Sequence, residues 1–262
     1  MLFKMLIKPV NFFYLFLIFT SFIACKSQDD YDCSSSDGKL IERIVETDSE
    51  GRQSIERFVY NAQNQLDSIV GEATNKASYA LSYNAKKQLI ERVLFTNHTS
   101  KPEKARIDSL EYDAKNRLVK SKEYSTNSGN GLAYLSTTIY TYNAQDKVEK
   151  EIWILRNDTL RTTIYEWQGE NIISETDFDE KGVKEWTFFY KYDNKNNPFF
   201  NTVYTYTKVQ SRNNVIESSA KDFSGRLDLI ANPATRKYRY NSSSFPTIET
   251  NNLSYKRTIC YK

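Results

Sequence analysis

The residue types that most often carry chemistry are sparse in this chain of 262 residues, which has three cysteines and one histidine. The histidine, His98, lies in the polar stretch Thr96-Asn97-His98-Thr99-Ser100. A lone histidine in such a stretch is more often a solvated side chain than a catalyst or a metal ligand. No second histidine is present to complete a usual zinc site, we do not expect His98 to serve in a Ser/His/Asp triad, and no glycine-rich phosphate loop is present. We therefore expect no catalytic residues, no cofactor and no metal.

Carboxylates are the remaining candidates for catalysis, because the chain has 33 Asp and Glu residues. Two carboxyl groups roughly 5–9 Å apart would suit a glycoside hydrolase, and only the fold can bring such a pair together. Asp177, Asp179 and Glu180 with Gly182 do not have the spacing of an EF-hand, and we interpret them as a solvated turn. A hydrolase with an Asp/Glu pair is an alternative to our prediction that the protein is not an enzyme.

Aromatic residues are abundant, with 19 Tyr, 15 Phe and 3 Trp. On an exposed face they could stack on sugars, whereas on a buried face they would pack the core. Trp167 and Trp186 alternate in register with other aromatic residues and are predicted to be core. Trp153 lies between Ile152 and Ile154, so we expect it on the opposite, more polar face. A glycan-binding surface protein is therefore a second alternative.

The first residues of the chain carry a targeting signal. Lys4 and Lys8 precede an apolar run, Val10 to Ile23, that is closed by Phe22-Ile23-Ala24-Cys25. A short apolar run that ends in small residues and a cysteine is typical of a signal peptide rather than of a spanning helix. The closing residues resemble a lipobox, and this resemblance implies that Cys25 is acylated, as with palmitate, before cleavage. Several acyl chains would hold the protein firmly to a bilayer. The alternative is a plain anchor helix with an incidental cysteine.

The residues after Cys25 indicate the membrane face to which the protein is exported. Lys26-Ser27-Gln28-Asp29-Asp30 resembles the short acidic export tag of Bacteroidota lipoproteins, which implies the outer face of the outer membrane; the alternative is an ordinary polar linker. Removal of Lys4 and Lys8 leaves 36 basic side chains less these two against 33 acidic ones, a net charge near +1. A surface with so little net charge has no general attraction for nucleic acid.

Two further features concern covalent modification. Cys33 and Cys260 lie at the two ends of the mature chain, and an even number of cysteines in an oxidising compartment indicates a disulfide; the alternative is two free thiols. Three Asp-Ser/Thr-apolar triplets resemble the O-glycosylation acceptor of Bacteroidota, and the resemblance implies Ser68, Ser109 and Thr159 as acceptors.

A repeat governs the rest of the chain: an aromatic residue, then Asn or Asp, and an apolar residue six positions after the aromatic. Asn and Asp open tight turns, and Gly supplies positive φ at the fifth position of the degenerate copies. Each unit therefore predicts a strand, a short turn and a second strand, which is a β-hairpin. The units run from Tyr60 to Leu66, Tyr83 to Leu89, Tyr112 to Leu118, Tyr142 to Val148, Trp167 to Ile173, Tyr192 to Pro198 and Tyr240 to Pro246, with degenerate copies that begin at Thr47, Phe178 and Lys221.

The residues before each turn alternate with a period of two. Leu110 and Tyr112 share one face of a strand while Glu111 lies on the other, and the other units follow the same rule. We expect no helix after Cys25. The units resemble the YD (Rhs-type) repeat, most closely in the copy from Lys221 to Leu227, and this resemblance implies a scaffold of β-hairpins without catalytic residues.

These observations predict an all-β protein with a signal peptide (1–24), a polar tether (25–38) and one β-repeat domain (39–262). The domain is expected to be a long antiparallel β-meander of hairpin repeats that forms a curled sheet or an open barrel. The predicted function is a non-catalytic binding or structural role at the cell surface. The predicted partners are the membrane, through the lipid anchor, and a cell-surface glycan or protein; nucleic acid is not expected.

Cys25→Ala should leave the precursor unprocessed, because acylation precedes cleavage in the maturation of lipoproteins. Metabolic labelling with a clickable fatty acid should mark the parent protein and miss the variant. Equal labelling of the two proteins would rule out the lipid anchor.

Overall fold

The computed structural model describes residues 33, 38–72, 77–96, 103–127, 131–200, 202, 209–225 and 233–262. The predicted signal peptide, Cys25 and His98 lie outside these residues. The described residues belong to one compact unit, Cys33–Lys262. No helix among them is both long and apolar enough to cross a membrane.

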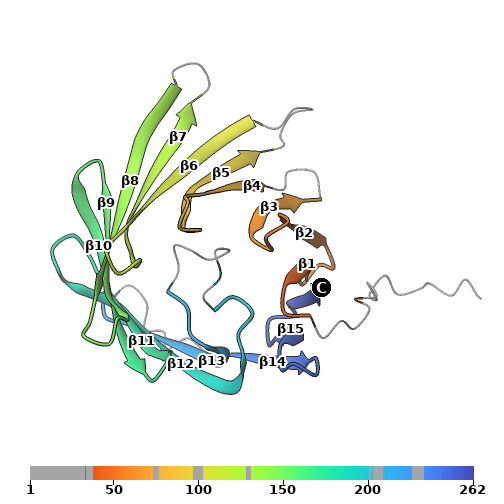
Figure 1. The fold of residues 1–262 in the computed structure, drawn as a ribbon. Helices are drawn as coiled ribbons and strands as arrows, with labels where there is room; N and C mark the ends of the chain where they lie inside the picture. Colours follow the sequence, from red (N-terminus) through yellow and green to blue (C-terminus); the bar gives the residue numbers. More distant parts are fainter. Residues whose placement is uncertain are drawn as a thin grey trace, which may run out of the picture. The chain divides into compact units, whose positions relative to one another are not determined.

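The unit is built of antiparallel strands, each paired with the next, and β1 pairs with β16, so that the sheet is a closed barrel (Figure 1). The predicted all-β antiparallel meander is confirmed, and the structure shows that it closes completely. Closure leaves no edge strand. The strands are β1 (Ile41–Thr47), β2 (Gln53–Tyr60), β3 (Leu66–Gly71), β4 (Ser78–Tyr83), β5 (Leu89–Thr96), β6 (Glu103–Tyr112), β7 (Leu118–Asn127), β8 (Gly131–Tyr142), β9 (Val148–Leu155), β10 (Asp158–Gln168), β11 (Asn171–Phe178), β12 (Lys184–Asn196), β13 (Asn213–Asp222), β14 (Ala234–Tyr240), β15 (Pro246–Asn251) and β16 (Lys256–Tyr261).

The repeat turns have the geometry that their Asn and Asp residues predict. In the first unit, Asn61 Oδ1 accepts the backbone N–H groups of Gln63 and Gln65 at 2.9 and 3.0 Å. The fifth residue, Asn64, has a φ of 57°, which Asn tolerates better than most residues do. The side chain of the second residue therefore supplies the hydrogen bonds that fix the turn. The same position is left-handed at Lys87, Asn116, Asp146 and Ser244 and, in the degenerate copies, at Gly51, Gly182 and Gly225.

A β-bulge follows most of these turns, whereas the turn between β1 and β2 keeps a regular register. Tyr112 pairs with Leu118 and Glu111 pairs with Lys120, so that Val119 is left without a partner in the β6–β7 ladder. A bulge bends its strand and increases the local right-handed twist. Repeated from hairpin to hairpin, this bend curls the sheet toward closure. The register shifts in the same way at Val59/Tyr60, Ser82/Tyr83, Thr141/Tyr142, Glu166/Trp167 and Arg239/Tyr240.

The bulges correct two sequence-based expectations. Trp153 was expected on the outer, polar face, but the bulge at Glu149 reverses the alternation, and Trp153 faces the interior between Thr138 and Arg161. The Trp167 unit closes at Ile172 rather than at Ile173. Its turn is shorter, and Ile173 is therefore the bulge residue, exposed on the outer face.

The unit from Tyr192 to Pro198 does not close a hairpin. Tyr192 pairs with Val215 instead, because the chain leaves the sheet after Asn196 and re-enters it at Asn213. Pro198 is buried and Phe199 packs against the apolar core. The described residues that follow β12 lie inside the ring of strands (Figure 1). We call these described residues, 197–200, 202 and 209–212, the internal loop.

Six of the repeat aromatics, and Tyr261 of the closing strand, bond to a backbone carbonyl of the preceding strand. The Tyr112 hydroxyl donates to the carbonyl oxygen of Leu89, the residue that closes the preceding unit, at 2.8 Å. We call this set of hydrogen bonds the aromatic ladder. Its other members are Tyr60 to Ile41, Tyr83 to Leu66, Tyr142 to Leu118, Trp167 Nε1 to Val148, Tyr192 to Ile172 and Tyr261 to Pro246, at 2.6 to 2.8 Å.

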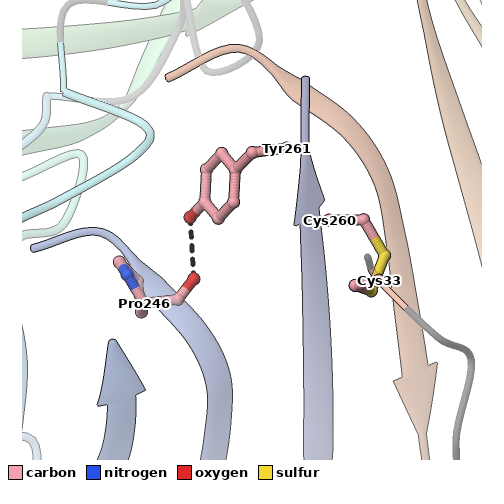
Figure 2. The surroundings of a disulfide bond; sticks show 4 residues. All are labelled: Cys33, Pro246, Cys260 and Tyr261. Carbon is pink, nitrogen blue, oxygen red and sulfur yellow. Dashed lines mark hydrogen bonds between the residues drawn. A yellow bond between two sulfur atoms is a disulfide. The ribbon is translucent and has the colours of Figure 1, made fainter. Parts of the chain in front are cut away.

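Cys33 and Cys260 are joined by a disulfide, with their Cα atoms 5.0 Å apart (Figure 2). Cys260 lies in the closing strand β16, where it is 2% exposed. The neighbouring Tyr261 donates to the Pro246 carbonyl (Figure 2). The bond therefore ties the start of the compact unit to the strand that closes the barrel.

Tyr112→Ala should lower the free energy of unfolding by about 3–5 kcal/mol, because it removes a core aromatic. Tyr112→Phe should cost about 1 kcal/mol, since it removes only the ladder hydrogen bond. Glu111→Ala should cost under about 0.5 kcal/mol, because Glu111 bridges Lys120 and Lys122 on the exposed outer face. Chemical denaturation measures all three, and equal losses at positions 111 and 112 would contradict the assigned faces.

Candidate functional site

The barrel interior is divided into two parts. One side is an apolar core contributed by β1 to β6 and by β16, against which Phe199 of the internal loop packs. These side chains are in mutual contact, and Ile41, Phe58 and Leu66 also line a smaller cavity of about 310 Å³. The buried members include Ile44, Phe58, Ile69, Leu89, Leu110 and Ile259.

The other side holds a cavity of about 900 Å³, which we call the polar chamber. Strands β6, β7, β8, β10 and β12 have 10 to 13 residues, whereas β1 to β5 have 6 to 8. The longer strands carry inward positions beyond the repeat aromatics, and these positions are polar. The lining comes from β5 to β14 and the internal loop, and includes Arg92, Asp108, Glu151, Trp153, Arg161 and Asp177.

A chain of ion pairs crosses the part of the chamber wall formed by β5, β6 and β7. Arg92 Nη2 lies 3.1 Å from Asp108 Oδ2, and Arg106 Nε lies 3.5 Å from Asp108 Oδ1. Arg106 also lies 3.6 Å from Glu123. Asp108 is only 2% exposed, so its charge is buried and needs these cations. The pairs fix the guanidinium and carboxylate groups in place.

A second polar group crosses β9, β10 and β11. Thr163 pairs in register with Glu151 on one side and with Asp177 on the other. The Thr163 hydroxyl donates to Asp177 Oδ1 at 2.6 Å, and the Tyr165 hydroxyl donates to Glu151 Oε2 at 2.9 Å. Arg161 Nη1 lies 4.0 Å from Asp177 Oδ2. Both carboxylates thus have fixed partners.

The burial of titratable side chains in the chamber wall shifts their pKa values. Burial raises the pKa of the Glu151 carboxyl above its ordinary value; the Tyr165 hydrogen bond and the charge of Arg161 oppose the rise, and Asp177 adds to it. Burial also raises the pKa of the Tyr165 and Tyr190 hydroxyls, and the charges of nearby carboxylates raise it further. These hydroxyls therefore remain protonated hydrogen-bond donors at neutral pH.

The internal loop forms part of the chamber wall. Ser211 Oγ accepts the backbone N–H of Ile172 at 2.9 Å and donates to the Tyr192 hydroxyl at 2.8 Å. The Asn197 amide donates to the Ser211 carbonyl at 2.8 Å. These bonds attach the described ends of the loop to the sheet beside the chamber.

The other candidate residues from the sequence lie apart from the chamber. Ser68, Ser109 and Thr159 occupy separate strands, β3, β6 and β10; Thr159 is exposed, and the other two are half-buried. Asp179 accepts the backbone N–H groups of Lys181 and Val183, as a turn residue does. Among the described residues, no three His, Cys, Asp or Glu side chains are grouped to hold a metal ion.

Sequence reasoning did not single out most of the chamber residues. Asp108, Leu110 and Tyr112 share one face of β6, so the charge at Asp108 lies on the same face as the core aromatics. The sequence signal for a polar cavity was therefore a charged residue on the core-facing side of a strand, four positions before a repeat aromatic. In β10 the charged residue is Arg161, which lies on the same face as Thr163 and Trp167, six positions before the aromatic.

No protein-family model matches this chain, and no curated protein does. Solved structures of similar fold include a porin-like protein from Bacteroides uniformis, with 12% identity and a TM-score of 0.54 over 86% of this chain and 97% of that one. A porin-like protein from Bacteroides vulgatus has 9% identity and a TM-score of 0.53 over 85% and 98% of the two chains. A Photorhabdus luminescens Tc holotoxin pore structure has 13% identity and a TM-score of 0.33 over 76% of this chain and 9% of that one. The two Bacteroides structures show that the barrel fold is shared.

Glu151→Gln tests the electrostatics of the chamber. Because the pKa of Glu151 is raised on folding, its ionisation destabilises the folded state as the pH rises above the ordinary Glu range. The Gln variant cannot ionise, so it should gain stability relative to the parent at about pH 8 and show no such gain at about pH 4. Denaturation curves across this range measure the difference.

Glu111→Gln is the matched control. The hydrogen bond from Lys122 lowers the pKa of Glu111, so its ionised form favours folding and the control should lose, not gain, a little stability as the pH rises. The same slope for both variants would contradict the difference between the two sites.

Proposed function

We propose that this protein is a lipoprotein of the outer-membrane surface whose barrel binds a small hydrophilic ligand in the polar chamber and does not transform it. The chamber is the observation that carries this proposal. Its volume of about 900 Å³ falls within the range of roughly 300–1,000 Å³ that small-molecule sites occupy. A barrel with a purely structural role would gain stability by filling this space with apolar side chains.

The arrangement of the lining also supports binding. Arg92 and Asp108 are held by each other, and Asp177 is held by Thr163. Groups fixed in this way lose little conformational freedom when a ligand arrives, and such preorganisation favours affinity. Burying so many charges is otherwise a poor way to stabilise a fold.

The outer face of the barrel supports anchoring by a lipid. Glu111, Lys120 and Lys122 lie on the outward faces of β6 and β7 and bridge one another. A lipid-facing strand carries an apolar band, in which charged side chains are destabilising. We therefore propose that acyl chains on Cys25, rather than the strands, attach the protein to the membrane.

Hydrolysis is the second candidate, and one observation favours it. Glu151 and Asp177 flank Thr163 on strands that are two apart, a separation of about 10 Å between backbones. The raised pKa of Glu151 is a property of general acids. Against this, both carboxylates already accept hydrogen bonds from neighbouring side chains.

Thr138→Trp should obstruct the chamber beside Trp153 and abolish binding there, because Thr138 lines the chamber and is paired with Trp153. The mature lipoprotein in detergent micelles would be screened by thermal shift against four groups of probes: neutral sugars, amines, carboxylic acids and nucleosides. A probe at 100 times its Kd should add about 2.7 kcal/mol of stability to the parent and none to the variant.

Thr141→Trp is the control, since Thr141 lies on the same strand but is exposed on the outer face; it should bind like the parent. If no probe stabilises the parent, the binding proposal fails and a structural role remains. Conversion of a probe to products, seen by mass spectrometry, would replace the binding role with the enzymatic one.

A further inference from the structure

We infer that the ligand of the polar chamber is a short, uncharged saccharide, up to about a trisaccharide, that stacks on Trp153. This inference rests on the proposed binding function and specifies its ligand. It follows from the polarity of the lining, the balance of its charges and the position of the one tryptophan in it.

The polarity of the lining excludes an apolar ligand. The guanidinium groups of Arg92, Arg106 and Arg161 and the carboxylates of Asp108 and Asp177 face the chamber. An apolar molecule would displace water from these groups without replacing its hydrogen bonds, and each lost partner costs binding free energy. The ligand must therefore carry many hydrogen-bonding groups.

The charges of the lining are balanced within the protein. Arg92 and Arg106 pair with Asp108, and Arg161 lies beside Asp177. A charged ligand would have to compete with these pairs. Breaking a partly buried pair leaves a charge uncompensated, which costs more than an added contact returns. An uncharged ligand leaves every pair intact.

The remaining polar groups include both donors and acceptors. The carboxylate of Glu151 accepts, the Tyr165 hydroxyl can accept because its proton is donated to Glu151, and the Thr138 hydroxyl can do either. Arg161 only donates, and its side chain is 49% exposed, so that a ligand can reach it. Sugar hydroxyls donate and accept at once, which suits a lining that contains both donors and acceptors.

Trp153 supplies a flat apolar surface in this polar lining. It faces inward between Thr138 and Arg161, and the Arg161 guanidinium carbon lies 5.9 Å from its ring centroid. An indole ring is apolar on its faces and polar at its N–H, and C–H groups make weak contacts with such a π surface. A pyranose ring has one such C–H face and a rim of hydroxyls, so it can contact Trp153 and the polar groups together.

The cavity volume limits the size of the ligand. Sites of roughly 300–1,000 Å³ enclose most of the surface of drug-sized molecules, and a di- or trisaccharide is of this size. A longer chain would have to extend out of the chamber, whose volume is about 900 Å³.

The inference is tested with the full mature lipoprotein in detergent micelles. An array of neutral mono-, di- and trisaccharides selects the best probe, and calorimetry measures its Kd. We expect Trp153→Ala and Arg161→Ala each to raise Kd about tenfold or more, and Trp153→Phe to raise it less, because Phe keeps a flat ring. Binding should change the tryptophan fluorescence of the parent and not that of Trp153→Phe.

Two outward-facing residues provide matched controls. Phe189 is an exposed aromatic on β12 and Arg239 an exposed arginine on β14, so Phe189→Ala and Arg239→Ala should leave Kd unchanged. A variant that fails to fold would show in its thermal unfolding curve. In that case Trp153→Phe, with its loss of the fluorescence change, still decides the role of the indole.

The outcomes separate this inference from the proposed function. If amines, carboxylic acids or nucleosides bind, sugars do not, and Thr138→Trp abolishes the binding, the saccharide inference is wrong and the binding function stands. If no probe of any class binds, both are wrong. If a sugar binds and Trp153→Ala and Thr138→Trp leave its Kd unchanged, the sugar occupies another site and the inference is overturned.

Discussion

Each ladder aromatic lies inside the barrel with its polar tip against a backbone carbonyl of the preceding hairpin, as in the bond from Tyr112 to Leu89. The carbonyls belong to the residues at the bulges, where the sheet pairing is interrupted, and a buried carbonyl without a donor is costly. One such bond contributes about 1 kcal/mol net. The larger effect is geometric, because each bond sets the distance between one hairpin and the next.

The ladder and the bulges together explain why the sheet closes. A bulge in most of the repeat hairpins adds twist, and the aromatic side chains fill the inside of the resulting curve. At the seam, Arg257 of β16 bridges Glu46 of β1 at 2.9 Å and Glu249 of β15 at 3.0 Å. The Cys33–Cys260 disulfide lies on the same closing strand. Closure is thus secured by pairing, by charge and by a covalent bond.

The polar chamber exists because the strands differ in length. On the side of β1 to β4, the inward positions are taken up by the aromatic ladder and the apolar core. On the other side, the longer strands β6 and β10 continue past the ladder, and their additional inward residues include Asp108 and Arg161. Buried ion pairs of this kind rarely stabilise a fold better than apolar residues would. Their presence inside the barrel supports the proposal that the chamber is a ligand site.

The sequence by itself determined the hairpins, because an Asn or Asp turn such as that of Asn61 depends only on its neighbours. The alternation of apolar and polar residues along the sequence, with a period of two, also placed Tyr112 on the inner face and Glu111 on the outer face. Tertiary structure decided the orientation of Trp153, since one bulge residue reverses the alternation of everything that follows it. It also decided the pairing of Tyr192 with Val215 and the meeting of Cys33 and Cys260, 227 residues apart. Tertiary structure also decided the chamber, because a cavity depends on which distant strands face one another, and no local sequence pattern encodes that arrangement.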